Sequence, residues 1–433
     1  MNPLDKAKSS KTFCILPWVH QYVGPPGDVK PCCVYDQDMQ IGDLKQHTLK
    51  EIWNNDATKQ MRLDMLNGVE IVGCLKCNSR SNLSTTHRVQ FNKTFFNNHV
   101  ELNENLVAST HTDGSLDEHK LQYIDARFNN LCNLKCRTCG PRFSTSWIDD
   151  VVKMYNIKKE DRIKNEAIFQ FPGKDEHQLL EEIIPQLQHV NRIYFAGGEP
   201  LMQKEHYIVL EEVIKLGKNI NPHFNLQYNT NFSALNLGKY DAIKLWKQFK
   251  QIQINASIDG SYARAEYWRK GTIWSELVNN VKRYRSEVPH GRFSISYTLS
   301  WINAFNILEL HREWVTSGLI SINEILINIL DVPSHYSLKS IPTWKKDKIK
   351  TQFNAHIKWM VNSNASPFII NGFKNSIIFM YSTDTGNNFI DGDKFNEITA
   401  KLDSIRNENF WEVYPEHDDI KNYITANNVN VNV

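Results

Sequence analysis

Strand-like and helix-like segments alternate between about residue 120 and residue 335, and this alternation constrains the fold more than any other feature. Six short apolar runs have strand character and end at polar or glycine-containing turns. Apolar residues at helical spacing lie between the runs, for example Tyr207, Leu210 and Ile214. Six such repeats predict an α/β fold with a parallel sheet, built as an open, partial (β/α)6 barrel. The predicted strands are Leu121–Phe128, Arg192–Phe195, Phe224–Tyr228, Ile252–Ile258, Phe293–Leu299 and Glu324–Leu330.

Segments of different composition flank the predicted barrel. A helix is expected from about Thr48 to Asn67, with Gly68 as its stop. The stretch that follows is rich in Asn, Ser, Thr and His and is expected to be a linker with a helix near Arg88–Phe96. The chain after Pro333 has helical patterning and a polar, Asn-rich end that we expect to fray. The predicted domains are a small Cys-rich domain (1–85), a linker (86–119), the barrel (120–335) and a helical C-terminal extension (336–433).

The charge and hydropathy of the chain exclude several classes of partner. Lys and Arg number 50 and Asp and Glu number 48, so the net charge of +2 offers no broad basic footprint for nucleic acid. No apolar stretch approaches the roughly 18 residues of a membrane span. The polar N-terminus does not resemble a signal peptide. We therefore expect a cytoplasmic protein with no membrane and no nucleic-acid partner.

Three cysteines follow the first predicted strand with the spacing C-x3-C-x2-C. They are Cys132, Cys136 and Cys139. Clustered cysteines in a long chain without a secretion signal favour metal ligands over disulfides. Iron–sulfur clusters are held by cysteine thiolates, usually four, so three would leave one iron open to another molecule. Structural zinc normally takes four ligands, and the nearest following histidine is His177. The spacing therefore favours an iron–sulfur cluster over zinc.

This cysteine motif and a second motif together resemble the radical S-adenosylmethionine (radical SAM) superfamily. The second motif is Gly197-Gly198-Glu199-Pro200, which follows the second predicted strand. The resemblance implies that Cys132, Cys136 and Cys139 hold a [4Fe–4S] cluster whose open iron chelates S-adenosylmethionine. Reductive cleavage of that cofactor would release a 5′-deoxyadenosyl radical, which abstracts hydrogen from a substrate.

The same resemblance implies further contacts to S-adenosylmethionine at the carboxyl ends of the strands. The glycine pair would meet the methionine amino group, and Arg269 would meet the carboxylate. An ordinary turn or a solvated helix face remains the alternative for each of these residues. The implied cofactor-binding residues are Gly197, Gly198, Glu199, Pro200, Asn229, Thr230, Asn231, Ser257, Asp259 and Arg269.

The N-terminal cysteines form a second candidate site, which on spacing alone fits zinc and an iron–sulfur cluster equally well. The pattern is Cys14-x12-Gly27-x4-Cys32, followed by Cys74-x2-Cys77. Residues 12–80 also resemble a SPASM/twitch auxiliary cluster domain, although that family usually places this domain after the barrel. The resemblance implies one auxiliary [4Fe–4S] cluster held by Cys14, Cys32, Cys74 and Cys77. Cys33 has the wrong spacing and is expected to be a buried structural thiol.

The resemblance implies a radical SAM enzyme of oxidoreductase or transferase type, with an auxiliary cluster that handles electron transfer. The expected substrate is a peptide or protein side chain, and the alternative within the class is dehydrogenation of a small alcohol or sugar. An electron donor such as flavodoxin or ferredoxin is an implied partner. A rival from another class is a non-catalytic, zinc-stabilised binding scaffold. A nucleic-acid-modifying enzyme is a third possibility, against which the charge balance argues.

Overall fold

All six predicted barrel strands are present in the computed structural model, close to their predicted bounds. The structure describes residues 10–78, 86–98 and 100–426. These six strands run parallel where their pairing is given, and helices lie between them along the chain. The predicted α/β fold class, with its Cys-rich N-terminal part and helical C-terminal part, is thereby confirmed. The six strands are β4 (Tyr123–Ala126), β6 (Arg192–Phe195), β7 (Asn225–Thr230), β10 (Ile252–Ser257), β12 (Arg292–Leu299) and β13 (Ile325–Ile329).

Contacts within the chain divide it into two units. The first unit comprises residues 1–130, 169–227 and 248–251, and the second comprises residues 131–168, 228–247 and 252–433. The C-x3-C-x2-C loop therefore belongs to the second unit, whereas the N-terminal cysteines belong to the first. The predicted domain boundaries at residues 85, 119 and 335 stay a prediction.

In the first unit, the N-terminal segment adds three strands that the sequence analysis did not predict. The strand order is β6-β4-β1-β2-β3. Strand β1 (His20–Val23) pairs parallel to β4, and β2 (Asp28–Lys30) and β3 (Gly42–Asp43) continue the sheet antiparallel. All residues of β1 and β4 are buried. Burial on both faces is typical of an internal parallel strand and removes the polar–apolar alternation that would reveal it.

The single helix predicted over residues 48–67 is wrong, because the structure has two helices there. They are α3 (Leu49–Trp53) and α4 (Asp56–Leu66). Asn55 caps the second helix, since its side-chain oxygen accepts the Thr58 N–H at 2.9 Å. The Asn54 side chain is bonded to the backbone of Leu116 instead of continuing a helix.

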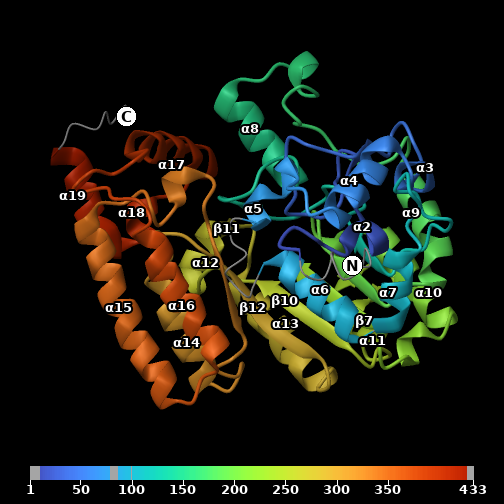
Figure 1. Ribbon diagram of the computed structural model, residues 1–433. Helices are drawn as coiled ribbons and strands as arrows, with labels where there is room; N and C mark the ends of the chain where they lie inside the picture. Colours follow the sequence, from blue (N-terminus) through green and yellow to red (C-terminus); the bar gives the residue numbers. More distant parts are fainter. Residues whose placement is uncertain (1–9, 79–85, 99, 427–433) are drawn as a thin grey trace. The chain divides into compact units, whose positions relative to one another are not determined.

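The expected linker contains two helices that lie against each other, α6 (His87–Asn98) and α7 (Val100–Ala108). The first overlaps the helix predicted near Arg88–Phe96. Figure 1 labels both, together with the other helices of the first unit. These are α2 (Leu16–Val19), α5 (Leu75–Asn78), α9 (Gln178–Ile183) and α10 (Lys204–Lys215).

In the second unit, the strand order is β13-β12-β10-β7. The parallel register sets Ser257 opposite Ser296 and Ile295 opposite Ile325. Two small antiparallel pairs accompany this sheet: β5 (Lys135–Cys136) with β11 (Arg269–Lys270), and β8 (Asn236–Leu237) with β9 (Tyr240–Asp241). The helices between strands are α11 (Ala242–Trp246), α12 (Tyr262–Trp268), α13 (Trp274–Glu287) and α14 (Asn306–Thr316).

The C-terminal part is helical, as predicted. Helix α16 packs on α15 and on strand β13, and α17 packs on α8 (Ile148–Tyr155), which follows the cysteine loop. The expected frayed tail falls on residues 427–433, which lie outside the described residues. Among the described helices, none is long and apolar enough to cross a membrane. The C-terminal helices are α15 (Thr343–Asn362), α16 (Pro367–Met380), α17 (Gly392–Arg406), α18 (Phe410–Val413) and α19 (Asp418–Ala426).

Candidate functional site

The cysteine loop of the second unit is fixed by backbone pairing. Strand β5 includes Cys136, which lies opposite Arg269 in β11. The pairing continues as the Arg137 N–H donates to the Trp268 carbonyl at 2.9 Å. The Trp147 indole N–H donates to the Cys136 carbonyl at 2.9 Å from the other side. The loop therefore has a defined position, although few of its residues belong to a helix or strand.

Polar donors surround two of the three cysteine sulfurs. The Cys132 Sγ accepts the Leu134 N–H at 3.4 Å and the Asn231 amide at 3.8 Å. The Cys136 Sγ accepts a guanidinium N–H of Arg269 at 3.5 Å. Hydrogen bonds to cysteine sulfurs stabilise the thiolate form and are among the determinants of an iron–sulfur cluster's reduction potential. Burial raises the pKa of the Cys136 thiol, and the charge and hydrogen bond of Arg269 oppose that rise.

Arg269 is held by Asp259, the strand-end residue of the predicted Ser257–Asp259 motif. Their Nη2 and Oδ2 atoms are 2.7 Å apart, and Asp259 is fully buried. The other Asp259 oxygen accepts the Thr298 N–H at 2.6 Å. Burial raises the pKa of the Asp259 carboxyl, and Arg269 and the Thr298 N–H oppose that rise. Two residues implied by sequence as cofactor contacts are therefore partners of each other, and Arg269 also reaches Cys136.

The remaining strand-end candidates of the second unit lie in two places. Asn231 follows β7 and bonds Asn133 of the cysteine loop at 2.9 Å, so it belongs to the loop environment. Asn229 accepts a hydrogen bond from Asn255 of β10 at 3.1 Å. Thr230 is buried, and its hydroxyl accepts the Phe232 N–H at 2.9 Å. Ser257 is half-buried at the end of β10.

The Gly197–Pro200 motif lies in the first unit, directly after β6. Gly197 has φ +113°, and a Cβ at this position would come within 3.1 Å of the Arg127 Cβ. Both facts explain glycine at this turn. The Glu199 side chain is buried and accepts the Leu201 N–H at 3.1 Å, which caps a short 3-10 helix that includes Pro200.

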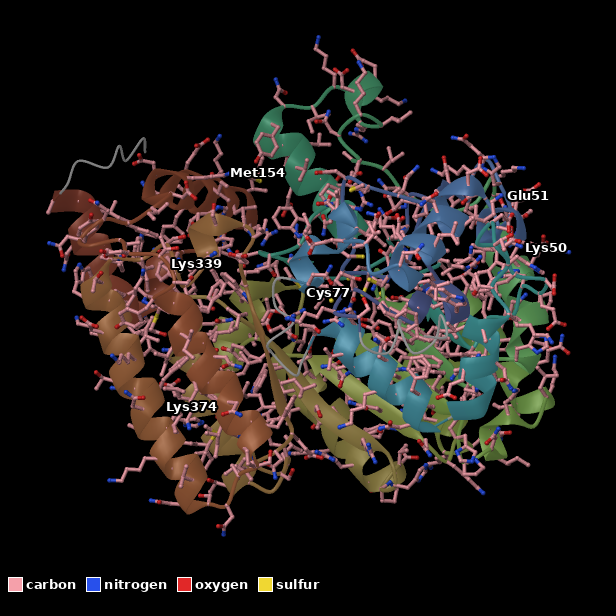
Figure 2. The ribbon with its side chains drawn as sticks, viewed as in Figure 1. Lys50, Glu51, Cys77, Met154, Lys339 and Lys374 are labelled. Atoms are coloured by element: carbon pink, nitrogen blue, oxygen red, sulfur yellow. The ribbon has the colours of Figure 1, made fainter. Side chains whose placement is uncertain are left out.

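The four N-terminal cysteines predicted as ligands line one pocket of the first unit. They come from separate short elements: Cys32 follows β2, and Cys77 lies on α5 (Figures 1 and 2). His87 and Arg88 of α6 line the same pocket. In a four-cysteine cubane each thiolate binds a different iron, so the donors must surround a space. Four cysteines around one pocket fit that requirement.

Two features fix the backbone around this pocket. Asn92 of α6 accepts the Ile15 N–H and donates to the Phe13 carbonyl, both at 2.9 Å, so it anchors the chain on either side of Cys14. Gly27, the glycine of the spacing motif, has φ +104°, and a Cβ there would come within 2.5 Å of the Pro172 carbonyl oxygen. The motif glycine is thus required by its turn.

Burial makes the thiols of Cys14, Cys32 and Cys74 hard to ionise without a metal. It raises the pKa of Cys14 and of Cys74 to about 12 each. The positive charge of Arg88 acts in the opposite direction on Cys14. Binding of iron must therefore displace protons from these thiols. Among the residues that the structure describes, no three His, Cys, Asp or Glu side chains are grouped as ligands of a single metal ion.

Cys33 differs from its neighbour Cys32. It does not line the pocket, and its thiol instead lies beside the Arg127 side chain, with Asp125 nearby. Burial raises its pKa to about 11. This surrounding agrees with the expectation that Cys33 is a structural thiol, which stays a prediction.

The sequence analysis missed several residues of these two sites. Arg88 and Asn92 lie in the segment expected to be a linker, where only the weak helical pattern near Arg88–Phe96 was a signal. Arg137 lies inside the cysteine motif, but the C-x3-C-x2-C pattern accepts any residue at that position. Asn133 likewise has no signal beyond its place between two cysteines.

Comparison with known families matches two parts of the chain. Residues 127–300 match the radical SAM superfamily, and residues 14–78 match SPASM, an iron–sulfur cluster-binding domain. The two matches contain the cysteine loop and the four pocket cysteines respectively. No curated protein matches the chain.

Solved structures give more distant similarities. One is native anSMEcpe with bound AdoMet, at 16% identity and TM-score 0.38 over 56% of this chain and 61% of that one. Another is Streptococcus suis SuiB bound to S-adenosylmethionine, at 14% identity and TM-score 0.37 over 65% of this chain and 62% of that one. The chain thus covers less than two thirds of each of these proteins.

Proposed function

Because the chain belongs to the radical SAM superfamily and carries an N-terminal SPASM-type cluster domain, we propose that it cleaves S-adenosylmethionine reductively and abstracts hydrogen from a peptide or protein side chain. Its cofactors are S-adenosylmethionine, the [4Fe–4S] cluster that binds it, and an auxiliary [4Fe–4S] cluster. The rival zinc-stabilised scaffold has no support in these family matches. Oxidation of the substrate, with net loss of hydrogen, is the reaction type proposed.

One observation carries this proposal: two of the three sulfurs of the cysteine loop, those of Cys132 and Cys136, already accept hydrogen bonds. Cys132, Cys136 and Cys139 would hold the first cluster, here called the barrel cluster. When bound, that cluster supplies the electron that cleaves S-adenosylmethionine to methionine and a 5′-deoxyadenosyl radical. Asn231 and Arg269 would stabilise the thiolates of Cys132 and Cys136, from the distances given above.

The predicted contacts to S-adenosylmethionine are proposed on local geometry. Gly197 has a positive φ, and because glycine has no side chain, the motif backbone can approach a ligand closely there. Glu199 caps the turn that follows and would hold it in shape. Ser257, Asn229 and Thr230 lie at strand ends, where parallel sheets bind ligands.

Cys14, Cys32, Cys74 and Cys77 would hold the auxiliary cluster. Four protein thiolates leave no iron open, so the cluster would not bind substrate directly. Its proposed task would be to accept the electron left on the substrate after hydrogen abstraction, while the substrate radical releases a proton to solvent. The electron would then pass to a protein such as flavodoxin or ferredoxin.

Neutral hydrogen-bonding groups favour an uncharged polar substrate group. In the second unit, Asn255 bonds Asn229, and Asn328 bonds Ser296 at 2.9 Å. Asn255 and Ser296 lie among buried apolar residues of β10 and β12, whereas Asn328 is exposed on β13. Such groups can bind the amides of a peptide backbone without charge pairing.

Isotope transfer tests the substrate class. Peptides encoded beside the gene, carrying deuterated side chains, are incubated anaerobically with the reconstituted enzyme, S-adenosylmethionine and dithionite. We expect deuterium in 5′-deoxyadenosine and a peptide that has lost hydrogen. Deuterium transfer from alcohols or sugars, with none from peptides, would instead establish a small-molecule radical dehydrogenase.

Arg269→Met should weaken the binding of S-adenosylmethionine and change the barrel cluster. A charged hydrogen bond is worth on the order of 1.5–3 kcal/mol, so the affinity should fall roughly ten- to a hundredfold. Loss of the donor to Cys136 should also make the cluster's midpoint potential more negative. Equilibrium binding and an EPR-monitored redox titration measure the two effects. Arg283→Met, whose partners are Asp241 and Glu287, is the control, and equal behaviour of both variants would refute these roles.

Arg88→Met should make the auxiliary cluster's midpoint potential more negative. Arg88 is the positive charge at Cys14, whereas burial lowers the pKa of His87 and favours its neutral form. We expect a shift on the order of 60 mV, which for a one-electron couple equals a tenfold change in the equilibrium constant. The same redox titration should find the barrel cluster unchanged. An unchanged auxiliary potential would mean that Arg88 does not act on this cluster.

A further inference from the structure

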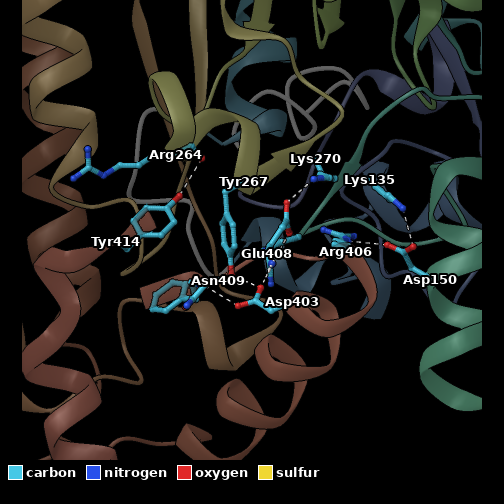
Figure 3. A network of polar contacts seen from close by, with 12 residues as sticks. Lys135, Asp150, Arg264, Tyr267, Lys270, Asp403, Arg406, Glu408, Asn409 and Tyr414 are labelled. Atoms are coloured by element: carbon cyan, nitrogen blue, oxygen red, sulfur yellow. Dashed lines mark hydrogen bonds and ion pairs between the residues drawn. The ribbon is translucent and has the colours of Figure 1, made fainter. Parts of the chain in front are cut away.

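Ion pairs join the C-terminal end of helix α17 to the cysteine loop of the second unit. Arg137, which lies between Cys136 and Cys139 in the sequence, has its Nη2 2.5 Å from the Asp403 Oδ1 and 2.9 Å from the Glu408 Oε2. The Arg137 side chain is only 1% exposed. Figure 3 shows Asp403 and Glu408 among the polar contacts of this region. Residues about 270 positions apart in the chain thus form one buried ion-pair cluster.

The cluster extends to the strand that pairs with the loop. Glu408 also contacts Lys270 of β11, with Nζ and Oε1 3.0 Å apart. Asp403 accepts the Tyr267 hydroxyl at 2.8 Å, and the Arg137 guanidinium lies 3.8 Å from the centre of the Tyr267 ring. The two acidic residues therefore contact Arg137, directly after β5, and Lys270 of β11, which are the neighbours of Cys136 and Arg269.

The same turn of α17 also makes a second set of contacts with the loop, here called the second arm; the contacts of Asp403 and Glu408 are the first arm. Arg406 is fully buried and donates to Asp150 of α8 at 2.7 Å, and Asp150 in turn contacts Lys135 at 2.8 Å (Figure 3). The Arg406 guanidinium also lies 4.7 Å from the Trp147 ring, whose N–H donates to the Cys136 carbonyl. Both arms end on the residues directly before and after Cys136.

The geometry of the helix end explains why these residues act together. Asn407 ends α17 in the left-handed conformation, with φ 52°, and the Glu408 N–H then bonds back to the Asp403 carbonyl at 2.9 Å. This turn presents Asp403, Arg406 and Glu408 at one end of the helix. Buried charges are stable only when paired, so each arm has a strongly preferred geometry.

We propose that residues 403–408 are positioning residues for the barrel cluster, so that the helical C-terminal segment belongs to the catalytic site. They touch neither cluster nor cofactor and act by fixing the two loop residues beside Cys136. This inference rests on the proposed cluster assignment of Cys132, Cys136 and Cys139. Partners of metal ligands typically change metal affinity ten- to a hundredfold when removed.

The test is the double variant Asp403→Asn/Glu408→Gln, which keeps shape and removes both acidic partners of Arg137. We expect a chelator to remove iron from the barrel cluster about ten- to a hundredfold faster than in the wild type. The EPR signal that responds to S-adenosylmethionine should also change shape, while the auxiliary signal stays. Asp419→Asn is the control, because it removes the partner of buried Lys345 within the same C-terminal segment. Wild-type iron release in the double variant, or equally fast release in the control, would overturn the proposal.

A triple variant separates positioning from the cost of an unpaired charge. In Arg137→Met/Asp403→Asn/Glu408→Gln no buried charge of this cluster is left alone, because Lys270, which loses Glu408, has a side chain that is 37% exposed. The protein should therefore fold even where the double variant does not. Fast iron release should persist, because the contact itself is gone. Wild-type release in the triple variant would overturn the proposal. A wild-type protein with about four irons and no signal responsive to S-adenosylmethionine would overturn the proposed function itself, and this inference with it.

Discussion

Replacing Cys132, Cys136 and Cys139 with alanine should abolish production of 5′-deoxyadenosine from S-adenosylmethionine under dithionite. These three thiols are the only cysteines after residue 77, so no other cysteine of that part of the chain can replace them. The iron content after anaerobic reconstitution should fall from about eight to about four, as one of two cubanes is lost. 5′-Deoxyadenosine is measured by chromatography with a deuterated standard.

The matched control for this triple variant is Cys33→Ala. Cys33 is a half-buried cysteine that lies beside Arg127 and does not line the auxiliary pocket. It should keep the full iron content and full production of 5′-deoxyadenosine. Continued production in the triple variant would remove the proposed role of the cysteine loop.

Replacing Cys74 and Cys77 with alanine should separate cofactor cleavage from product formation. The iron content should again fall to about four, while the barrel cluster and the cleavage of S-adenosylmethionine without substrate remain. Little or no final product should form, because no acceptor is left for the substrate electron. The variant should also unfold at a lower temperature, since a metal site contributes to the folding of the segment it joins. Iron, 5′-deoxyadenosine and product are measured on one preparation.

Two results would contradict this account of the auxiliary cluster. One is full product formation by the Cys74/Cys77 variant. The other is zinc instead of iron in the N-terminal site of the wild-type protein. If Cys33→Ala lost iron and Cys32→Ala did not, Cys33 and not Cys32 would be the ligand of the auxiliary cluster.

The strands and helices of the barrel could be predicted because they alternate along the chain, contain many apolar residues and are bounded by turns. Strand β6 was predicted at its observed bounds, and β10 differs from its prediction by one residue. Strand β1 was missed because it precedes the repeating strand–helix pattern and two of its four buried residues, His20 and Gln21, are polar. The helix over residues 48–67 was wrong because apolar spacing does not register that Asn54 and Asn55 bond elsewhere and start a new helix.

The cysteines could be found from spacing alone, but their surroundings could not. The family resemblance suggested Arg269 as a cofactor contact, and only the structure brings it to Asp259 and Cys136. Arg88 lies on a helix inside an apparent linker. The partners of Arg137 lie more than 260 residues later in the chain, and no local pattern can reveal so distant an ion pair.

EPR spectroscopy of the dithionite-reduced Cys74/Cys77→Ala variant, with and without S-adenosylmethionine, tests the central claim most directly. This variant should contain only the cluster of Cys132, Cys136 and Cys139. We predict one [4Fe–4S] signal whose shape changes when S-adenosylmethionine is added. The reason is that the cofactor would bind the fourth iron of the cluster, which has no cysteine ligand. A signal that is unaffected by S-adenosylmethionine, or no iron–sulfur signal at all, would contradict the account.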